Sequence, residues 1–358
     1  MSNKTRVEKL RENLPEGYGA ALVQYDFNRA YLSSFASSAG MLLVTPKNAW
    51  LLVDFRYYEM ACKGAKGVEV LLVDGGFYKL IDKLLGESGI KKIMLENQTT
   101  ISELNAIKAA LPGYEFDCSN TLSNIISKLR CIKDKDEIEK MKAAQAITDA
   151  AFAHIVTVIK PGMTEREVAA ELEYYMRKNG ADALAFETIC VSGSKTSLPH
   201  GKPDDKVIQN GDFVTMDYGA LKNGYCSDMT RTVAVGGVSE EQKRVYEIVL
   251  RAHLESMAAV RAGVRGNEID KIAREIIYAE GFEGCFGHGL GHSVGMEIHE
   301  EPRFSPTCKE SIESNTIMTI EPGIYIEGKF GVRIENMIVV RDNGYENLTN
   351  SPRELIIV

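Results

Sequence analysis

The sequence predicts an α/β domain followed by an α+β domain, and three observations support this prediction. The chain has 358 residues, a length that corresponds to about two domains with separate hydrophobic cores. Up to about residue 120, short apolar runs alternate with amphipathic stretches, whereas longer helical patterns separate the strand-like runs of the remainder. All six histidines lie at or beyond His154, so any catalytic centre that uses histidine is expected in the second domain.

The first domain is predicted to span residues 1–125 around a mostly buried sheet. Its strand-like runs are "AALVQY", "MLLVT", "AWLLVD", "VEVLLV" and "KKIMLE". The stretch from Phe77 to Leu85 has the spacing of an amphipathic helix. Alternation of this kind is typical of an α/β domain. The stretch that begins "NIISKLRC" is expected to open with a linker before a long helix, and the domain boundary is placed near residues 122–130.

The second domain is predicted to span residues 126–358. Its first helix follows the linker and ends before Pro161 and Gly162, which do not continue a helix. The predicted helices cover residues 135–159, 164–179, 239–262 and 266–280. The strand-like runs are "DFVTMDYG", "NTIMTIE" and "GVRIENMIVV". This order indicates an α+β domain.

A weak internal repeat relates two parts of the second domain. The segments "IKPGMTEREV" (159–168) and "VRAGVRGNEI" (260–269) share glycines and glutamates that stand 101 residues apart. Each segment follows one helical pattern and opens another, so a duplicated helix pair would give a domain with pseudo-two-fold symmetry and ligands from both halves. Chance similarity over ten residues explains the match equally well.

Composition excludes several classes of function. A net charge of −8 without clustered Lys and Arg argues against a nucleic-acid or anionic-membrane surface. The polar N-terminal stretch lacks a secretion signal, and no run approaches the roughly 18–20 apolar residues of a membrane span. The seven cysteines are scattered and include no CxxC pair, which indicates reduced, mostly buried thiols and a cytoplasmic protein. A cysteine nucleophile is the alternative, but none is paired with a histidine in a recognisable motif.

The stretch "HGLGHSVGMEIHEEP" contains three of the six histidines, His288, His292 and His299. Glycines interleave with them, which indicates backbone in close approach or with positive φ, not a helix, so the helical HExxH zinc motif does not apply. The alternative is a glycine-rich surface loop with solvated histidines.

Four carboxylates, those of Asp217, Asp228, Glu321 and Glu335, lie at strand ends or within strand-like runs. Burial of a lone carboxylate is costly unless it is paired or bound to a metal. A solvated edge position would explain any one of them, but less readily all four beside a histidine cluster. Four carboxylates and an imidazole suit two divalent cations about 3.5–4 Å apart, which make a nucleophile of water at neutral pH. The oxygen-rich set favours Mn or Co, with Fe and Zn as alternatives.

The motifs "DYGALKNGYCSDMTRT", "GHGLGHSVGMEIHEEPR", "TIEPGIY" and "GVRIEN" together resemble the proline-specific branch of the pita-bread metallopeptidases, namely the Xaa-Pro dipeptidases (prolidases) and aminopeptidase P. The resemblance extends from about Lys133 to the end and implies a pita-bread catalytic domain. The first domain, through "YLSSFASSAGMLLVT" and "WLLVDFRYYEMA", is similar to the creatinase-type N-terminal domain.

The resemblance implies a role for each ligand. Asp217, Asp228, His292, Glu321 and Glu335 would bind two metal ions per subunit. Of these, Asp228 and Glu335 would contact both ions, whereas Asp217 and His292 would belong to opposite ions. Glu321 would also be the general base, which accepts a proton from water and passes it to the leaving nitrogen.

The resemblance also implies roles for residues around the ligands. His200 and His299 would assist at the scissile bond and stabilise the oxyanion. His288 would line the proline end of the pocket. Arg303 would hold the free carboxylate of the substrate, with a solvated arginine as the alternative. The side chains of Thr230 and Arg333 would orient the ligands two residues away, with ordinary strand packing as the alternative. The remaining histidines, His154 and His253, fall in helical patterns and are interpreted as structural.

The implied activity is hydrolysis of the bond before proline in short peptides, by an Xaa-Pro dipeptidase that forms a homodimer. The alternatives are an Xaa-Pro aminopeptidase acting on longer peptides, a methionine aminopeptidase, or a binding protein without activity. Some prolidases place a histidine from the partner's first domain over the active site. Here residues 1–125 contain no histidine, so that form of substrate capping is not expected.

Overall fold

The computed structural model describes residues 4–358. Contacts between residues divide the chain into two units, Met1–Arg130 and Cys131–Val358. The sequence-based boundary at 125/126 therefore falls inside helix α6 (Thr121–Cys131). Within the described residues, no helix is long and apolar enough to cross a membrane.

The first unit contains a six-stranded sheet with the order β4-β3-β2-β1-β5-β6. The strands are β1 (Ala20–Val23), β2 (Met41–Val44), β3 (Ala49–Val53), β4 (Glu69–Leu72), β5 (Lys92–Leu95) and β6 (Glu115–Asp117). All five predicted runs form strands. β2 is antiparallel to both of its neighbours, whereas β3–β4, β1–β5 and β5–β6 are parallel. Strands β1 and β3 are buried throughout, which explains why they lack a polar face in the sequence.

Helices cover this sheet and complete its core, as the predicted α/β class requires. They are α1 (Arg6–Asn13), α2 (Asp26–Ser33), α3 (Phe55–Gly64), α4 (Phe77–Ser88), α5 (Ile101–Ala110) and α6. The amphipathic helix predicted from Phe77 is confirmed as α4, which places Ile81 and Leu85 in the core.

The prediction of a linker from residue 124 on is wrong for residues 124–131, because they belong to α6. Leu122 and Ile126 stand one helical turn apart and are both buried. Arg130, a further turn on, donates a hydrogen bond from Nη1 to Oδ1 of Asn28 at 2.8 Å. The segment therefore belongs to the first unit, and the polar residues that suggested a linker form the exposed side of a helix.

The second unit contains the four predicted helices, α7 (Lys135–Ile155), α8 (Glu165–Lys178), α9 (Glu240–Ala259) and α10 (Gly266–Ala279). The two segments of the internal repeat form the same structure, a turn between consecutive helices. Gly162 and Gly263 occupy equivalent turn positions with φ of 96° and 91°, a region that favours glycine. The repeated sequence therefore corresponds to a repeated helix pair.

The strands of the second unit form several sheets. They are β7 (Ala183–Leu184), β8 (Ile189–Ser192), β9 (Phe213–Tyr218), β10 (Ala220–Lys222), β11 (Tyr225–Cys226), β12 (Met229–Ala234), β13 (Gly291–Ser293), β14 (Glu300–Phe304), β15 (Ile317–Ile320), β16 (Gly323–Ile326), β17 (Phe330–Arg333), β18 (Asn336–Arg341) and β19 (Gly344–Asn347). The two sheets that matter for the site have the orders β12-β9-β8 and β14-β13-β15-β18-β19. One predicted run, "GVRIENMIVV", is two strands, because β17 pairs with β16 and β18 pairs with β15 and β19.

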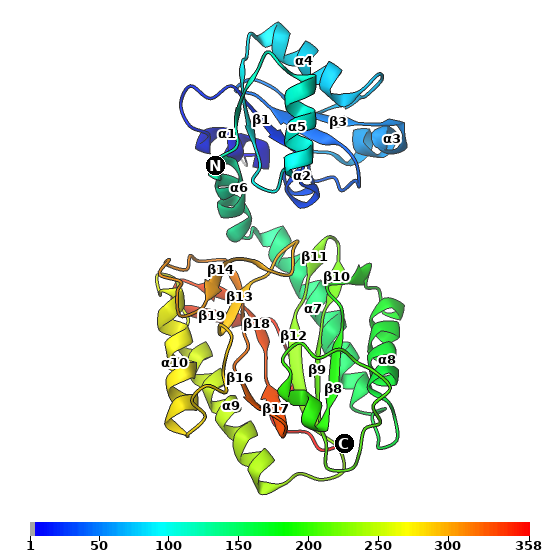
Figure 1. The fold of residues 1–358 in the computed structure, drawn as a ribbon, viewed down its shortest axis with the longest axis vertical. Coiled ribbons are helices and arrows are strands. Elements are labelled where there is room, and N and C mark those ends of the chain that lie inside the picture. The colour runs from blue at the N-terminus through cyan, green and yellow to red at the C-terminus, as the bar shows by residue number, and fades with distance from the viewer. Residues whose placement is uncertain (1–3) are drawn as a thin grey trace. The chain divides into compact units, whose positions relative to one another are not determined.

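In the second unit the strands lie between the two helix pairs, with α7 and α8 on one side and α9 and α10 on the other (Figure 1). One core cluster joins α7 and α8 to β8, β9 and β12. A second joins α9 and α10 to β15, β17 and β18. The predicted α+β class is confirmed, and both halves contribute strands to the middle of the unit.

Candidate active site

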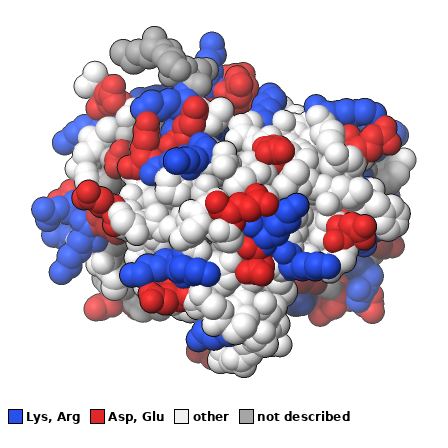
Figure 2. Space-filling model, turned by 90° about the horizontal axis from the view of Figure 1, so that it is seen from above, with Lys and Arg blue, Asp and Glu red and all other residues white. Residues whose placement is uncertain are grey.

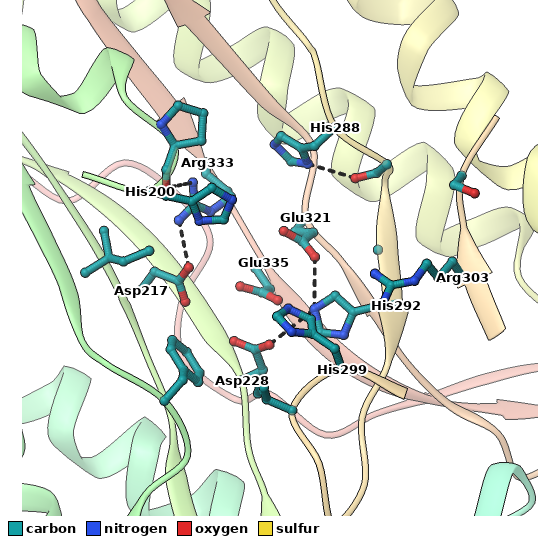
Figure 3. A pocket seen from close by; sticks show the side chains of 17 residues that line it. His200, Asp217, Asp228, His288, His292, His299, Arg303, Glu321, Arg333 and Glu335 are labelled. Carbon is teal, nitrogen blue, oxygen red and sulfur yellow. Dashed lines mark hydrogen bonds and ion pairs between the residues drawn. The ribbon is translucent and has the colours of Figure 1, made fainter. Parts of the chain in front are cut away.

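Ten of the residues predicted for the site line one cavity of about 270 Å³ in the second unit (Figure 3). They are His200, Asp217, Asp228, His288, His292, His299, Arg303, Glu321, Arg333 and Glu335. Thr230 lies behind this lining and reaches it through a hydrogen bond to Glu335. The structure therefore brings together residues from segments more than a hundred positions apart.

The strands of both halves position the carboxylates. Asp217 lies in β9, and Asp228 directly precedes β12, which pairs antiparallel with β9 and sets Thr230 opposite Asp217. Glu321 directly follows β15, and Glu335 lies where the chain passes from β17 to β18. Each of the four carboxylates thus lies in or beside a strand between the helix pairs, where neighbouring backbone is fixed.

Gly291 allows β13, the strand that contains His292, to lie close to β15 and the carboxylates. A Cβ atom at Gly291 would lie 2.1 Å from the carbonyl oxygen of Thr319 in β15, a distance that no side chain allows. Gly291 does not have a positive φ, so its role is close approach of two strands. This places His292, the next residue, beside Glu321, with Nε2 3.3 Å from Oε1.

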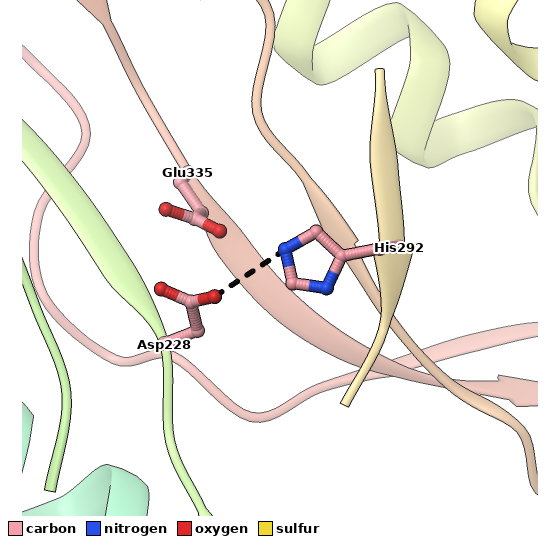
Figure 4. Close-up of side chains that lie close together, drawn as sticks. All are labelled: Asp228, His292 and Glu335. Atoms are coloured by element: carbon pink, nitrogen blue, oxygen red, sulfur yellow. Dashed lines mark ion pairs between the residues drawn. The ribbon is translucent and has the colours of Figure 1, made fainter. Parts of the chain in front are cut away.

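Asp228, His292 and Glu335 come closest together (Figure 4). Each offers one potential ligand atom, and these atoms all lie within 4.8 Å of one another. Nε2 of His292 lies 3.5 Å from Oδ2 of Asp228. All three residues are buried.

The hydrogen bonds of His292 determine which of its nitrogens faces the carboxylates. Nδ1 lies 3.1 Å from the carbonyl oxygen of Ser293, which can only accept, so Nδ1 carries the proton. Burial lowers the pKa of His292 to about 3, with the nearby His299 acting in the same direction, so the ring is neutral. Nε2 therefore presents a lone pair to two carboxylates.

The carboxylates raise one another's pKa. Burial raises the pKa of Asp228 and of Glu335 well above the usual range, and the charges of neighbouring carboxylates add to this effect. Burial likewise raises the pKa of Glu321 to about 7, although Arg333 opposes the rise. The crowded carboxylates and the neutral imidazole therefore offer more hydrogen-bond acceptors than the surrounding residues offer donors.

Arg333 supplies part of the missing positive charge. It is buried, and its Nη2 donates to Oδ2 of Asp217 at 2.7 Å while its Nε donates to Oγ1 of Thr230 at 3.0 Å. The Thr230 hydroxyl in turn donates to Oε2 of Glu335 at 2.7 Å. The other oxygen of Asp217, Oδ1, is buried and has no hydrogen-bond partner within the described residues.

These features fit divalent cations. Five potential ligands face the same cavity. They are a lone pair of His292, an unpartnered oxygen of Asp217 and the crowded oxygens of Asp228, Glu321 and Glu335. Oxygen donors with one imidazole are a common ligand set for such ions. Among the four carboxylates, the guanidinium of Arg333 pairs with Asp217 only, so further positive charge is needed to offset the burial of the other three carboxylates.

Sequence reasoning missed Tyr325, which connects two of the predicted residues. Nη1 of Arg333 donates to the Tyr325 hydroxyl at 2.9 Å, and that hydroxyl lies 2.9 Å from Nε2 of His288. Nδ1 of His288 faces the carbonyl of Gly289 at 2.8 Å and so carries the proton. Tyr325 therefore donates to Nε2, which leaves His288 without a free polar atom. Tyr325 follows Glu321 by four residues in the motif "TIEPGIY", but nothing in that spacing indicates the bond.

The remaining predicted residues, His200, His299 and Arg303, line the same cavity beside the carboxylates. The rings of His299 and His292 meet edge to face, with centroids 4.5 Å apart. His200 is exposed and faces the cavity from the loop after β8 (Figure 3). The side chain of Arg303 is 44% exposed, and its Nε lies 3.1 Å from Oε1 of Glu301, so it is free to reorient toward a ligand.

The other two histidines lie outside the cavity. His154 pairs with Glu171 and stacks on Tyr175, whose ring centroid is 4.2 Å away. His253 is buried in α9. All seven cysteines are free thiols, but the expectation that most of them are buried is wrong, because only Cys190 and Cys226 are buried.

Comparison with protein families agrees with this geometry. Residues 139–342 match the model of metallopeptidase family M24, and residues 6–132 match the creatinase/prolidase N-terminal domain. The chain belongs to metallopeptidase family M24. It is a metallopeptidase with the two-domain pita-bread architecture of this family, and its cofactor is a divalent metal.

Similar proteins cover almost the whole chain of this M24 member. The Xaa-Pro dipeptidase from Bacillus anthracis is 42% identical with a TM-score of 0.95, and 99% of each chain is covered. The X-Pro aminopeptidase from Thermotoga maritima is 39% identical with a TM-score of 0.90, and covers 96% of this chain and 98% of its own. The curated Xaa-Pro dipeptidase of Pyrococcus horikoshii is 38% identical over 98% of each chain.

Proposed function

We propose that this metallopeptidase hydrolyses the peptide bond that precedes proline, as an Xaa-Pro dipeptidase. The observation that carries the proposal is the group of four carboxylates and one neutral imidazole that converge in a single cavity beside three further histidines and two arginines. The activity named for its relatives supports the choice of proline. A peptide bond to proline is a tertiary amide without an N–H, which requires a dedicated site.

In this proposal, Asp217, Asp228, His292, Glu321 and Glu335 hold two divalent cations. Mn and Co suit the oxygen-rich donor set best, with Fe and Zn as alternatives. When bound, the cations polarise the substrate carbonyl and make a nucleophile of water at neutral pH.

The chain's own residues move the protons and hold the peptide. A carboxylate oxygen of Glu321 accepts one proton of the attacking water. The water oxygen bonds to the carbonyl carbon, the C–N bond to proline breaks, and the proton passes from Glu321 to the proline nitrogen. His200 and His299 stabilise the oxyanion by hydrogen bonds from their ring N–H groups.

His288 and Arg303 complete the peptide site. Because Tyr325 and the Gly289 carbonyl occupy both ring nitrogens of His288, this residue offers the substrate a ring face, which suits the apolar ring of proline. Arg303 suits the free carboxylate of the proline residue in a dipeptide. The cavity of about 270 Å³ suits short peptides.

The protein is expected to be active as a homodimer. Light scattering during size-exclusion chromatography measures the mass of the particle, and a mass of one 39.6 kDa chain would contradict this expectation.

The test compares the wild-type protein with Glu335→Ala. The wild-type protein should contain close to two metal ions per chain and release proline from Xaa-Pro dipeptides in the presence of Mn or Co. The variant should lose metal and activity together. A wild-type protein that stays inactive on all Xaa-Pro dipeptides after loading with either metal would contradict the proposal and favour a binding function.

The second candidate is an Xaa-Pro aminopeptidase, the activity named for the relative from Thermotoga maritima. The two candidates differ in whether the substrate ends at proline or continues beyond it. Preference for Xaa-Pro-Xaa tripeptides over Xaa-Pro dipeptides would favour the aminopeptidase. A methionine aminopeptidase is a weaker candidate, and methionine release from peptides without proline would be needed to support it.

A further inference from the structure

One buried carboxylate outside the cavity, Glu165, holds both ends of the loop that carries His200. This loop follows β8 and contains the short 3-10 helix η1 (Gly193–Ser197). Glu165 is the first residue of α8 and is completely buried. Neither the metal ligands nor the proposed catalytic residues include it.

The start of the loop is bound to both oxygens of Glu165. Oε1 accepts hydrogen bonds from the backbone N–H and the hydroxyl of Ser192, at 2.7 and 2.9 Å. Oε2 accepts from Nζ of Lys195 at 2.7 Å. The carboxylate thus fixes the point where the chain leaves β8.

The end of the loop is bound to the same carboxylate and to the first turn of α8. Oε2 of Glu165 also accepts from the backbone N–H of Asp204 at 3.3 Å, and Nζ of Lys195 reaches Oδ2 of Asp204 at 2.6 Å. The N–H groups of Glu165 and Arg166, which have no partner within the helix, donate to the carbonyls of Lys206 and Asp204 at 3.0 and 3.1 Å. The two ends are therefore closed against each other.

Between these ends the loop is largely exposed. Ser194, Leu198 and His200 itself are exposed, although Thr196 and Gly201 are buried, so apolar packing covers only part of this stretch. Two contacts reach it from the cavity side. Nη1 of Arg333 donates to the carbonyl of Pro199 at 3.2 Å, one residue before His200, and the N–H of Gly331 donates to Oγ1 of Thr196 at 2.8 Å.

We infer that Glu165 is a positioning residue of the reaction, which sets the place of the His200 ring by closing the loop beneath it. This inference rests on the proposed function. A buried carboxylate paired with a cation contributes little net stability, but its directional hydrogen bonds specify one geometry. Displacement of a reacting group by about 1 Å can cost about a hundredfold in rate.

The test compares Glu165→Gln, His200→Ala and the double variant on an Xaa-Pro dipeptide, with metal content measured for each. Gln keeps the shape of the side chain but loses the charge that binds Lys195. The control is Glu187→Gln, because Glu187 forms an exposed pair with Lys202 of the same loop, at 2.8 Å. Trypsin cleavage after Lys195 and Lys206 reports the order of the loop independently of activity.

Glu165→Gln should lower kcat by about tenfold or more with KM and metal content nearly unchanged. Its effect should disappear when His200 is already Ala, and trypsin should cut the loop faster. Glu187→Gln should resemble the wild type in all these measurements. If Glu165→Gln does not fold, Lys195→Met is used in the same comparison with the same expectations for kcat, KM and metal content, and trypsin cleavage is then followed after Lys206 alone.

Effects of Glu165→Gln and His200→Ala that multiply in the double variant would overturn the inference, as would a kcat equal to that of the control. A wild-type protein that releases no proline contradicts the proposed function and, with it, any role of Glu165 in the reaction. An active wild type with an unaffected Glu165→Gln contradicts the inference alone.

Discussion

We expect the hydroxyl of Thr230 to order the proposed metal ligands without binding a metal itself. It is fully buried, donates to Glu335 and accepts from Arg333, so it connects a ligand with the charge beside Asp217. We expect Thr230→Val, which keeps the shape and removes the hydroxyl, to weaken Mn binding by about 10–100-fold with the fold retained. Calorimetric titration of the metal-free protein with Mn measures this change.

The matched control for this variant is Thr215→Val. Thr215 is also buried, and its hydroxyl lies 3.0 Å from that of Thr232 on the neighbouring strand without contacting a ligand carboxylate. Equal Mn affinity in the two variants would show that the hydroxyl of Thr230 does not order Glu335.

The burial of His253 leads to a prediction about how the stability of the fold depends on pH. Burial lowers its pKa to about 3, with the charges of Arg231 and Arg353 acting in the same direction, so the folded protein holds it neutral. In the unfolded chain its pKa is about 6.5. Between these values the unfolded chain binds more protons, so stability is present in full above about pH 6.5 and is lost as pH falls toward 3.

His253→Leu should therefore flatten the dependence of the free energy of unfolding on pH. The wild type should lose up to about 1.4 kcal/mol more per pH unit than the variant between pH 6 and 4. Urea unfolding at several pH values measures both slopes. Parallel slopes would mean that His253 is not buried as a neutral ring.

Single residues were predictable where a motif names them. The five proposed metal ligands, the three further histidines and both arginines of the cavity could be chosen from sequence because short motifs contain them. Tyr325 and Glu165 could not, since their partners are distant in sequence and their residue types are common. Buried hydrogen bonds between distant segments leave no local pattern.

At the level of elements, a buried ion pair fixes the connection between β13 and β14. Nζ of Lys133 lies 3.1 Å from Oε2 of Glu300 and 3.1 Å from Oγ of Ser293. Ser293 follows His292, and Glu300 follows His299, so one ammonium holds the residues next to both histidines. The two side chains are only 1% and 7% exposed.

Lys133→Met should leave the carboxylate of Glu300 buried with less compensation and lower the free energy of unfolding by about 3–5 kcal/mol. Additional replacement of Glu300 by Met should recover part of this loss, because the buried charge is then absent. Chemical unfolding measures both. Lys142→Met removes two partly exposed ion pairs, with Glu139 and with Glu346, and should change stability by less than about 1 kcal/mol for each. A similar loss in both lysine variants would contradict this account.

Elements were predictable where periodicity is strong and local. The four long helices of the second unit and the apolar strands of the first were predicted within a few residues. α6 was not, because its exposed polar side resembles a linker. The change from β17 to β18 was not predicted either. The backbone changes its pairing partner at Ile334 and Glu335, and no glycine or proline marks this point in the sequence.

For the whole molecule, metal removal should affect the two units differently. All the proposed metal ligands lie in Cys131–Val358, so chelation should lower the unfolding temperature of that unit by about 5–10 °C at a cation concentration near 100 times its dissociation constant. The transition of Met1–Arg130 should stay in place. Scanning calorimetry with and without EDTA measures both transitions, and Glu335→Ala should show no shift on chelation. A wild type whose two transitions move together would contradict this prediction.

Fold class was predictable for the whole chain because alternation and length are global properties. Charge was informative in the same way. On the face shown in Figure 2, basic and acidic side chains are interspersed. This agrees with the sequence, which has a net charge of −8 and in which Lys and Arg are not clustered. The oligomeric state follows from neither property.

The distribution of the ligands over both halves of the second unit has a consequence for how the protein is made. Asp217 and Glu335 are 118 residues apart, which a ribosome takes about 6–24 s to synthesise. During that interval the aspartates exist without the partners that complete a site, and strong metal affinity develops only once the second half has folded onto the first. Metal acquisition is therefore a late event, and the ion that is captured depends on which ions surround the finished chain.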